Sequence, residues 1–456
     1  MQREKLGSRL GFILLSAGCA IGVGNVWKFP WMVGQYGGGA FVVFYVLFLL
    51  ILGLPIMTME FAVGRASQKS PVRAYQELEK PGTKWHIHGY LAMIGNYLLM
   101  MFYTTVCGWM LHYFYLTASG KFVGATTEEV GAAFPEMLSQ PLVMIGWMVV
   151  VVVVGFAINS FGLQGGLERV TKVMMIALLA IMVILAINSV TTDGASEGLK
   201  FYLIPDLNRM MESGPVNVIV GAMNQSFFTL SLGIGAMAIF GSYIGKGRAL
   251  LGEAVNVAIL DTFVAFTAGL IIFPACFAFG VSPDSGPNLI FVTLPNIFNH
   301  MALGRLWGSL FFVFMAFAAF STVLAVFENI MSCCMDLTGW SRKKVALFNT
   351  VLMILLSLPC VLGYNVWSGF QPFGEGSALL DLEDFLVSNI WLPLGSLVYL
   401  LFCTTRYGWG WKNFKEEANE GGGMKVRDGI RFYVSYILPL IVIVIFVLGI
   451  KDKFFA

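Results

Sequence analysis

The segment AGCAIGVGNVWKFP, residues 17–30, lies in the first long apolar stretch of the chain. Three glycines, an asparagine and a lysine interrupt it, and glycine costs about 1 kcal/mol relative to alanine inside a helix. In a membrane, backbone groups released by a break need partners within the protein, so a break persists only where it lines a cavity or binds a ligand. The segment therefore predicts an unwound helix. Its free carbonyls would face a cation, and the N-terminus of the half-helix that follows would face an anion.

The composition indicates a membrane protein. Of the 456 residues, 57% are hydrophobic and 12% are charged, and this charged fraction is about half that of an average soluble protein. Apolar runs of about 20 residues recur along the whole chain, as in an all-α polytopic membrane protein. The net charge of +2 does not indicate a nucleic-acid partner. The seven cysteines lie in or beside apolar runs without a CxxC pair, so they predict neither a disulfide framework nor a metal site.

We predict eleven transmembrane helices in contact with the lipid bilayer. They cover approximately residues 10–35, 39–63, 88–117, 141–159, 166–188, 216–243, 250–280, 302–335, 344–363, 385–405 and 431–450. With a cytoplasmic N-terminus, 21 of the 28 lysines and arginines would lie on the cytoplasmic side. Because basic residues concentrate on that side, we expect the N-terminus inside and, with an odd number of spans, the C-terminus outside.

Two glycine-containing segments of the sequence are similar to each other. AIGVGN at 20–25 in the first span is similar to SLGIGA at 231–236, five spans later. Glycine-broken segments at matching places in two halves indicate inverted repeats, as in many transporters. The predicted parts are a first repeat at 1–188, a second repeat with its preceding external loop at 189–405, and a cytoplasmic loop with the last span at 406–456. Chance glycine pairs stay an open alternative. A nucleotide-binding loop is disfavoured because the third glycine and the preceding strand are missing.

Five segments closely resemble the neurotransmitter:sodium symporter family, in particular its bacterial transporters of leucine, of several hydrophobic amino acids and of tyrosine. They are AGCAIGVGNVWKFPW (17–31), YGGGAFVVFYVLFLLILGLPIMTMEFAVGR (36–65), NQSFFTLSLGIGAMAIFGSY (224–243), ILDTFVAFTAGLIIFP (259–274) and LLDLEDFLVSNIWLPLG (379–395). The resemblance covers nearly the whole chain. It implies a 5+5 inverted-repeat fold with helices 1 and 6 unwound, a bacterial plasma-membrane location, no organic cofactor and no enzymatic activity.

The resemblance also implies two sodium sites made of oxygen atoms, which this hard cation prefers. The first comprises the Ala20 carbonyl, Asn25, Thr229 and Asp261. The second comprises the carbonyls of Gly18, Ile21 and Ala318 and the hydroxyls of Ser321 and Thr322. For these two hydroxyls the alternative is a hydrogen bond to the preceding helical turn.

Asp261 is a functional candidate on physical grounds as well. A carboxylate in the middle of a span costs about 2.5–3.5 kcal/mol on insertion scales unless something compensates it. Chloride-dependent relatives have a serine four residues later, where this chain has Ala265. We therefore predict that Asp261, next to Tyr45, Gln225 and Thr229, supplies the negative charge that chloride supplies elsewhere, and that transport does not require chloride.

By the same resemblance, the backbone at Val23 and Gly24 and the Tyr103 hydroxyl would hold a substrate carboxylate. Carbonyls of Phe228, Thr229 and Ser231 would hold its ammonium group. Gly22 stands where monoamine carriers have aspartate, which favours a substrate that brings its own carboxylate. The expected side-chain pocket is formed by Leu99, Val106, Phe228, Leu232, Ile234, Val323 and Val326. Because this pocket is apolar, it predicts a hydrophobic L-amino acid.

The expected outer gate is the pair Lys28 and Asp384, above lid residues Tyr103 and Phe228. The expected inner gate is Arg3 with Asp336, near Ser242 and Tyr243. Three positions depart from the family pattern. Lys28 replaces an arginine and cannot form its two-pronged bond, Leu6 replaces a tryptophan, and Ile176 replaces a proline that helps span 5 unwind. Glu60 fits the family's second span, whereas the sequence offers no explanation for Glu328.

The predicted mechanism is sodium-driven symport by alternating access. Two other classes compete with it. A sensor on a transporter scaffold would keep the pocket without transport. An enzyme would need a catalytic cluster, and the sequence contains no HExxH motif. His86 and His88 are better explained as interfacial residues at a helix entrance than as metal ligands.

Overall fold

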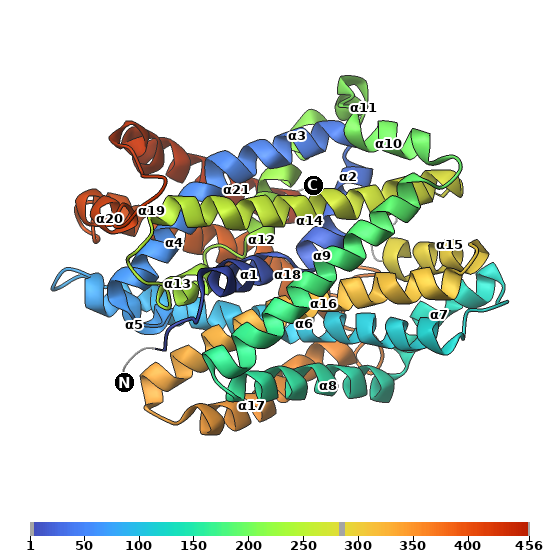
Figure 1. Cartoon of the computed structure of the whole chain (residues 1–456), viewed down its shortest axis with the longest axis horizontal. Coiled ribbons are helices and arrows are strands. Elements are labelled where there is room, and N and C mark those ends of the chain that lie inside the picture. The colour runs from blue at the N-terminus through green and yellow to red at the C-terminus, as the bar shows by residue number, and fades with distance from the viewer. Residues whose placement is uncertain (1–3, 282–287, 455–456) are drawn as a thin grey trace.

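The structure is a computed structural model that describes residues 4–281 and 288–454. Within these ranges the chain is helical apart from loops and an isolated bridge between Arg248 and Gly422. The long helices run mainly along the longest axis of the molecule, and short helices and loops join them at its two ends (Figure 1). The fold is therefore an all-α bundle, as the apolar runs predict.

Nine helical segments of the described residues are long and apolar enough to cross a membrane. They are α3–η2–α4 (Gly39–Phe48, Leu49–Gly53, Leu54–Ser67), α6 (His86–Ser119), α8 (Pro141–Ser160), η3–α9 (Leu163–Glu168, Arg169–Val190), α14 (Leu250–Ala278), α16 (Gly304–Thr338), α17 (Arg342–Leu362), α18–η5–α19 (Leu379–Phe385, Leu386–Trp391, Leu392–Thr404) and η6–η7–α21 (Asp428–Ile430, Tyr433–Ile437, Leu438–Phe454). Each of the nine overlaps a predicted span.

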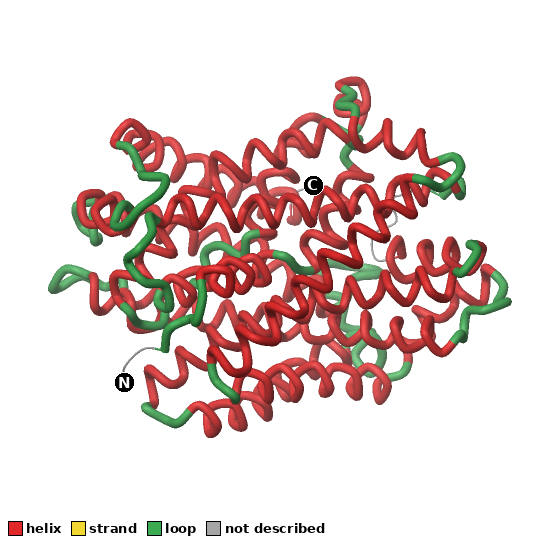
Figure 2. The backbone as a smooth tube through the Cα atoms, viewed as in Figure 1, coloured by secondary structure: helices red, strands yellow, loops and turns green. Residues whose placement is uncertain are grey.

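Two further apolar segments are interrupted. In the first, α1 (Arg9–Ala20) and η1–α2 (Gly24–Lys28, Phe29–Gln35) meet at an angle of 54° and would form a tenth span together. In the second, α12 (Pro215–Thr229) and α13 (Ala236–Gly241) are separated by six non-helical residues, 230–235. This linker is visible as a loop in the interior of the bundle (Figure 2). Neither α12 nor α13 is long enough to cross a bilayer alone, so eleven spans stay a prediction.

The connecting helices separate into two groups. Helices α7 (Thr127–Ser139), α10 (Ala195–Leu203), α11 (Leu207–Glu212) and α15 (Leu294–His300, after η4, Leu289–Thr293) gather at one end, and α5 (Pro71–Leu78) and α20 (Trp411–Ala418) lie at the other, near the N-terminus (Figure 1). Loops predicted on the same side of the membrane thus share an end of the molecule. Which end faces the cytoplasm stays a prediction.

Helix α16 forms the centre of the bundle. In its most apolar stretch 78% of the residues are buried, against 33% for α8, and it packs against α1, α6, α8 and α9. A helix enclosed on all sides is apolar all round, so its few polar side chains need partners inside the protein. The polar residues of α16 therefore mark where the site can lie.

At the end that carries the N-terminus, the α13–α14 loop is tied to the loop after α20. The Ala249 N–H donates to the Gly422 carbonyl at 2.9 Å, and the Gly422 N–H donates to the Gly247 carbonyl at 3.2 Å. Buried Arg65 from α4 supports the junction through an ion pair with Glu417, Nε to Oε1 2.5 Å. The hydrogen bond that Lys246 donates to Glu420, together with the charge of Glu417, raises the pKa of Lys246.

This junction requires glycine at position 421 but not at 422. Gly421 has φ +90°, and a Cβ there would lie 2.4 Å from the Arg248 nitrogen, whereas a Cβ on Gly422 meets nothing within 4 Å. We expect Gly421→Ala to lower the free energy of unfolding by about 1–3 kcal/mol and Gly422→Ala to change it by less than about 0.5 kcal/mol. Thermal unfolding of the purified variants in detergent measures both. Equal midpoints for the two variants would contradict this account of the loop.

Candidate functional site

The break in the first apolar segment opens its backbone at the centre of the bundle. Helix α1 ends at Ala20, and Ile21 is extended with ψ 101°. Gly22 lies in a place that tolerates no side chain, since a Cβ would stand 2.2 Å from the Tyr103 hydroxyl and 2.5 Å from Thr322 Oγ1. The glycine thus permits α6 and α16 to approach the break closely.

The break in the second segment is stabilised by a buried carboxylate. Ser231, Gly233 and Gly235 all have positive φ, at 50°, 95° and 73°, so the chain turns repeatedly between α12 and α13. Glu60 of α4 accepts hydrogen bonds from the backbone N–H groups of Gly233 at 2.5 Å and Met237 at 3.3 Å. These bonds satisfy backbone donors that the missing helical turn leaves free.

Asn25 and Thr229 of the first predicted sodium site meet Asp261 of α14, which is fully buried. Asn25 Nδ2 donates to Asp261 Oδ1 at 2.8 Å and the Tyr45 hydroxyl donates to Oδ2 at 3.2 Å. Thr229 Oγ1 lies 3.2 Å from both carboxylate oxygens. Both broken segments and α14 therefore meet in one buried oxygen cluster, formed by the Asp261 carboxylate, Thr229 Oγ1 and the Tyr45 hydroxyl, to which Asn25 presents its amide nitrogen. In the described residues no basic side chain pairs with Asp261, so a cation is its natural counter-charge.

The residues of the second predicted sodium site also converge. Thr322 Oγ1 lies 3.2–3.3 Å from the carbonyl oxygens of Gly18, Cys19 and Ile21. Ser321 Oγ lies 2.9 Å from the Ala318 carbonyl and 3.3 Å from that of Ile21. Each hydroxyl has one hydrogen and can satisfy one of these acceptors. The cluster thus has more acceptors than donors, which suits a cation bound through oxygen. Sequence reasoning missed the Cys19 carbonyl because nothing in its side chain points to a backbone ligand.

The two breaks border a central cavity of about 20 Å³, which Thr322 of the second cluster also lines. Its walls come from both breaks and from α6, α16 and α19, and consist of Cys19, Ala20, Gly22, Gly24, Leu99, Tyr103, Phe228, Ser231, Thr322 and Leu392. Tyr103 and Phe228 also border a larger cavity of about 360 Å³ on their other side. These two rings thus separate the cavities. The Val23 N–H donates to the Tyr103 hydroxyl at 2.8 Å, so the predicted carboxylate-binding groups are adjacent.

The remaining predicted pocket residues lie around this centre rather than in its walls. Val23 and Val106 line the larger cavity. Leu232, Ile234, Val323 and Val326 are fully buried but line neither of the two cavities in the described part of the chain. The Ile234 side chain lies against Gly95 of α6, and the Val323 side chain lies against Gly155 of α8. Leu392 of α19, which the sequence did not suggest, does line the centre.

Comparisons with known proteins give a family match over nearly the whole chain. The model of the sodium:neurotransmitter symporter family matches residues 3–128 and 136–454. The chain belongs to this family. It is 34% identical to the uncharacterized sodium-dependent transporter YhdH of Bacillus subtilis, over 96% of both chains. It is 30% identical to an uncharacterized sodium-dependent transporter of Haemophilus influenzae, over 98% of both chains.

A solved structure is similar throughout. The crystal structure of MhsT in complex with L-phenylalanine superposes with a TM-score of 0.88 and 35% sequence identity, and the match covers 98% of this chain and 100% of that one. The family resemblance read from the sequence is thereby confirmed. The protein is a membrane symporter of a sodium-coupled transporter family, and this family is not one of enzymes.

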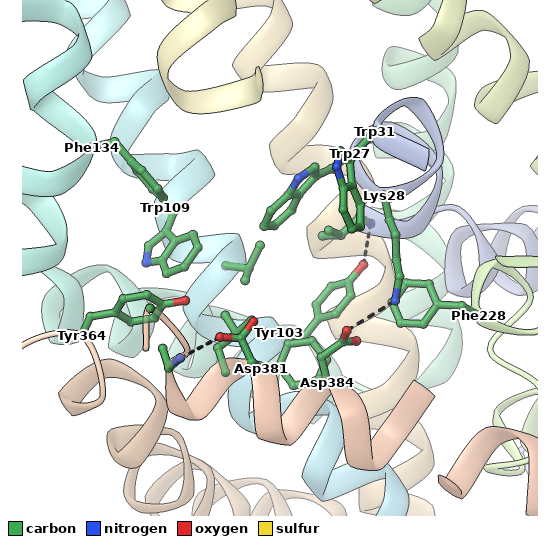
Figure 3. Close-up of a pocket in the computed structure, with 16 residues that line it drawn as sticks. Trp27, Lys28, Trp31, Tyr103, Trp109, Phe134, Phe228, Tyr364, Asp381 and Asp384 are labelled. Atoms are coloured by element: carbon green, nitrogen blue, oxygen red, sulfur yellow. Dashed lines mark hydrogen bonds and ion pairs between the residues drawn. The ribbon is translucent and has the colours of Figure 1, made fainter. Parts of the chain in front are cut away.

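The symporter's expected outer gate residues are in contact. Lys28 Nζ lies 3.4 Å from Asp384 Oδ2 and 3.9 Å from the centre of the Phe228 ring, and Figure 3 shows the lysine between these two side chains. Ser388 Oγ donates to Asp384 Oδ1 at 2.7 Å. Although lysine lacks the fork of arginine, it combines an ion pair with a cation–π contact. The same residue therefore links the gate to the lid of the central cavity.

The predicted inner gate is described only in part, because Arg3 lies outside the described residues. Asp336 accepts a hydrogen bond from the Ser70 N–H at 2.8 Å. The Tyr243 hydroxyl donates to Glu328 Oε1 at 2.6 Å. Glu328 also accepts hydrogen bonds from both Nη atoms of Arg342, at 2.6 and 2.9 Å. A bidentate ion pair of this kind accounts for the buried acid that the sequence left unexplained. The partner is the first residue of α17, fourteen positions after Glu328.

Two further departures from the family pattern have structural outcomes. Helix α9 continues through Ile176 without a break. The segment before α1, which contains Leu6, is held by Glu168 of η3. Glu168 accepts hydrogen bonds from the Gly7 N–H at 2.8 Å and from Ser8 Oγ at 3.0 Å.

The two histidines of the predicted helix entrance have separate surroundings. His86 pairs with Glu79 at 2.6 Å, and buried His88 packs against Tyr75 and Tyr399.

Proposed function

We propose that the symporter couples the entry of sodium ions to the entry of a hydrophobic L-amino acid by alternating access. The observation that carries the proposal is the central cavity, whose walls come from both broken segments and include Thr322 of the second oxygen cluster. Its wall residues Gly24 and Phe228 are the chain neighbours of Asn25 and Thr229 in the first cluster. The solved MhsT complex contains L-phenylalanine, which supports an amino-acid substrate. The eleven-span 5+5 arrangement, with a cytoplasmic N-terminus, is part of the proposal.

In this proposal each cluster binds one sodium ion as a co-substrate. Asp261, Asn25, Thr229 and the Ala20 carbonyl form the first site, close to where the substrate carboxylate would lie. The second site ties α1 to α16 through Thr322 and Ser321. Because the ion and the amino acid share neighbouring oxygen atoms, each improves the binding of the other. Sodium would thus stabilise the state that accepts substrate from outside.

The apolar part of the central cavity supports a hydrophobic substrate. Leu99, Phe228, Leu392, Cys19 and Ala20 supply its apolar side chains, and the polar groups are backbone, Tyr103, Ser231 and Thr322. The walls contain no charged side chain to pair with a polar substrate side chain, and an unpaired charge there would be costly. A cavity of about 20 Å³ is far smaller than an amino acid, so substrate entry requires Tyr103 and Phe228 to move apart toward the larger cavity.

Uptake into proteoliposomes tests the function. With sodium outside and potassium inside, labelled L-phenylalanine and L-leucine should accumulate, and competition by all twenty amino acids should rank hydrophobic ones first. Replacement of chloride by gluconate should leave the rate unchanged, because Asp261 supplies the negative charge. A large loss in gluconate would refute the role given to Asp261. Sodium-dependent binding without uptake or counterflow would show the alternative, an amino-acid sensor.

A further inference from the structure

Helix α19 reaches the centre of the bundle through contact between two glycines. A Cβ on Gly395 would lie 2.0 Å from the Gly233 carbonyl oxygen, and a Cβ on Gly233 would lie 2.3 Å from the Leu392 carbonyl oxygen. The backbone of α19 therefore touches the break between α12 and α13 directly. Pro393 at the start of α19 follows the π-helical turn η5, which ends one residue before Leu392.

This contact places the Leu392 side chain in the wall of the central cavity, where it is 2% exposed. Tyr103 and Phe228 line both cavities, whereas Leu99 and Leu392 line only the central one. The two leucines thus lie on the side away from the larger cavity, which Lys28 and Asp384 line. They form the closed end of the space that an entering amino acid would fill.

We propose that Leu392 sets the upper limit on the size of the substrate side chain. The inference rests on the proposed function, in which the polar groups near Val23 and Tyr103 hold the substrate carboxylate. The substrate side chain then extends away from those groups, toward the apolar residues of the cavity. Its length is limited by the residues at the closed end, since a packed interior admits an extra group only at a cost.

Leu392 is better suited to this role than the other apolar wall residues. Phe228 also packs against Lys28, so its size is tied to the outer gate. Leu99 lies one turn before Tyr103 on α6, and the Tyr103 hydroxyl is a predicted ligand of the substrate carboxylate. The carbonyl of Cys19 belongs to the second oxygen cluster. Among these four, Leu392 alone belongs to an element that contributes no predicted sodium or substrate ligand. Its size can therefore vary without changing the ion sites.

The test compares Leu392→Ala with Leu394→Ala in proteoliposomes. Leu394 is on the same helix but 39% exposed, so it controls for a general effect on α19. The measurement is inhibition of labelled L-leucine uptake by valine, leucine, phenylalanine and tryptophan. For Leu392→Ala we expect the inhibition constant of tryptophan, divided by that of valine, to fall by about 10-fold or more, because the shortened side chain leaves room for a larger substrate. Leu392→Phe should shift the ratio the opposite way, and Leu394→Ala should leave it unchanged.

The half-saturating sodium concentration should stay the same in all these variants. An unchanged ratio in Leu392→Ala, or equal weakening of all four inhibitors, would overturn the inference. If Leu392→Ala cannot be purified, Leu392→Val removes a single methylene and must shift the ratio in the same direction by a smaller factor. Absence of sodium-dependent uptake of any amino acid by the unaltered protein would instead refute the proposed function, and the inference with it.

Discussion

Replacement of Asp261 with alanine should reduce sodium-driven uptake by on the order of 100-fold or more. The carboxylate accepts hydrogen bonds from Asn25 at 2.8 Å and from Tyr45 at 3.2 Å, and Thr229 lies 3.2 Å from both its oxygens. Removing it takes away the negative charge of the first oxygen cluster and leaves these buried donors without their acceptor. Two lost contacts to a charged group, at about 1.5–3 kcal/mol each, correspond to this factor.

The measurement is the initial rate of labelled amino-acid uptake as a function of external sodium concentration. Glu253→Gln is a suitable control, because Glu253 is another buried acid of α14 and its partner, Arg9, is half exposed. This control should keep the half-saturating sodium concentration of the unaltered protein. An Asp261→Ala variant with normal uptake and normal sodium dependence would remove Asp261 from the sodium site.

The second large effect is expected for Gly22→Ala. A methyl group at this position would stand 2.2 Å from the Tyr103 hydroxyl and 2.5 Å from Thr322 Oγ1. The Tyr103 hydroxyl accepts a hydrogen bond from the Val23 N–H, and Thr322 belongs to the second oxygen cluster. One added carbon therefore displaces groups of both the substrate and the sodium sites. Overpacking typically costs about 1–3 kcal/mol, so we expect uptake to fall by about 5- to 150-fold.

A matched glycine distinguishes this effect from a general loss of stability. Gly146 on α8 has nothing within 4 Å of an added Cβ, so Gly146→Ala should transport at the normal rate. For Gly22→Ala, equilibrium binding of labelled amino acid and its sodium dependence should weaken together, while the amount of folded protein recovered in detergent changes little. Normal transport by Gly22→Ala would mean that Tyr103 and Thr322 do not need their present positions.

Several features of the centre could be predicted from the sequence because they depend on local chemistry. Glycine at positions 22, 233 and 235 signals backbone that a regular helix does not accommodate, and a lone carboxylate at 261 in an apolar run signals a partner. The family resemblance supplied the ligand sets, and the structure brings Asn25, Thr229 and Asp261 together. The outer pair of Lys28 and Asp384 was likewise expected.

Other features depend on which faces of distant helices meet. Val323 and Val326 follow Thr322 on α16, yet Val323 contacts α8 rather than the cavity, because successive helical residues point about 100° apart. Glu328 finds Arg342 across the turn between two helices.

The sequence by itself determined that this is a membrane protein of the sodium:neurotransmitter symporter family, with interruptions in its first and sixth apolar segments. Hydropathy, glycine spacing and isolated polar residues are properties of single segments, so they can be read without a fold. Only the tertiary structure decided that Leu392 lines the central cavity and that Glu328 pairs with Arg342. The sequence of a helix that is apolar all round does not indicate which side chain faces which neighbouring helix. Only the packing of the folded protein determines these contacts.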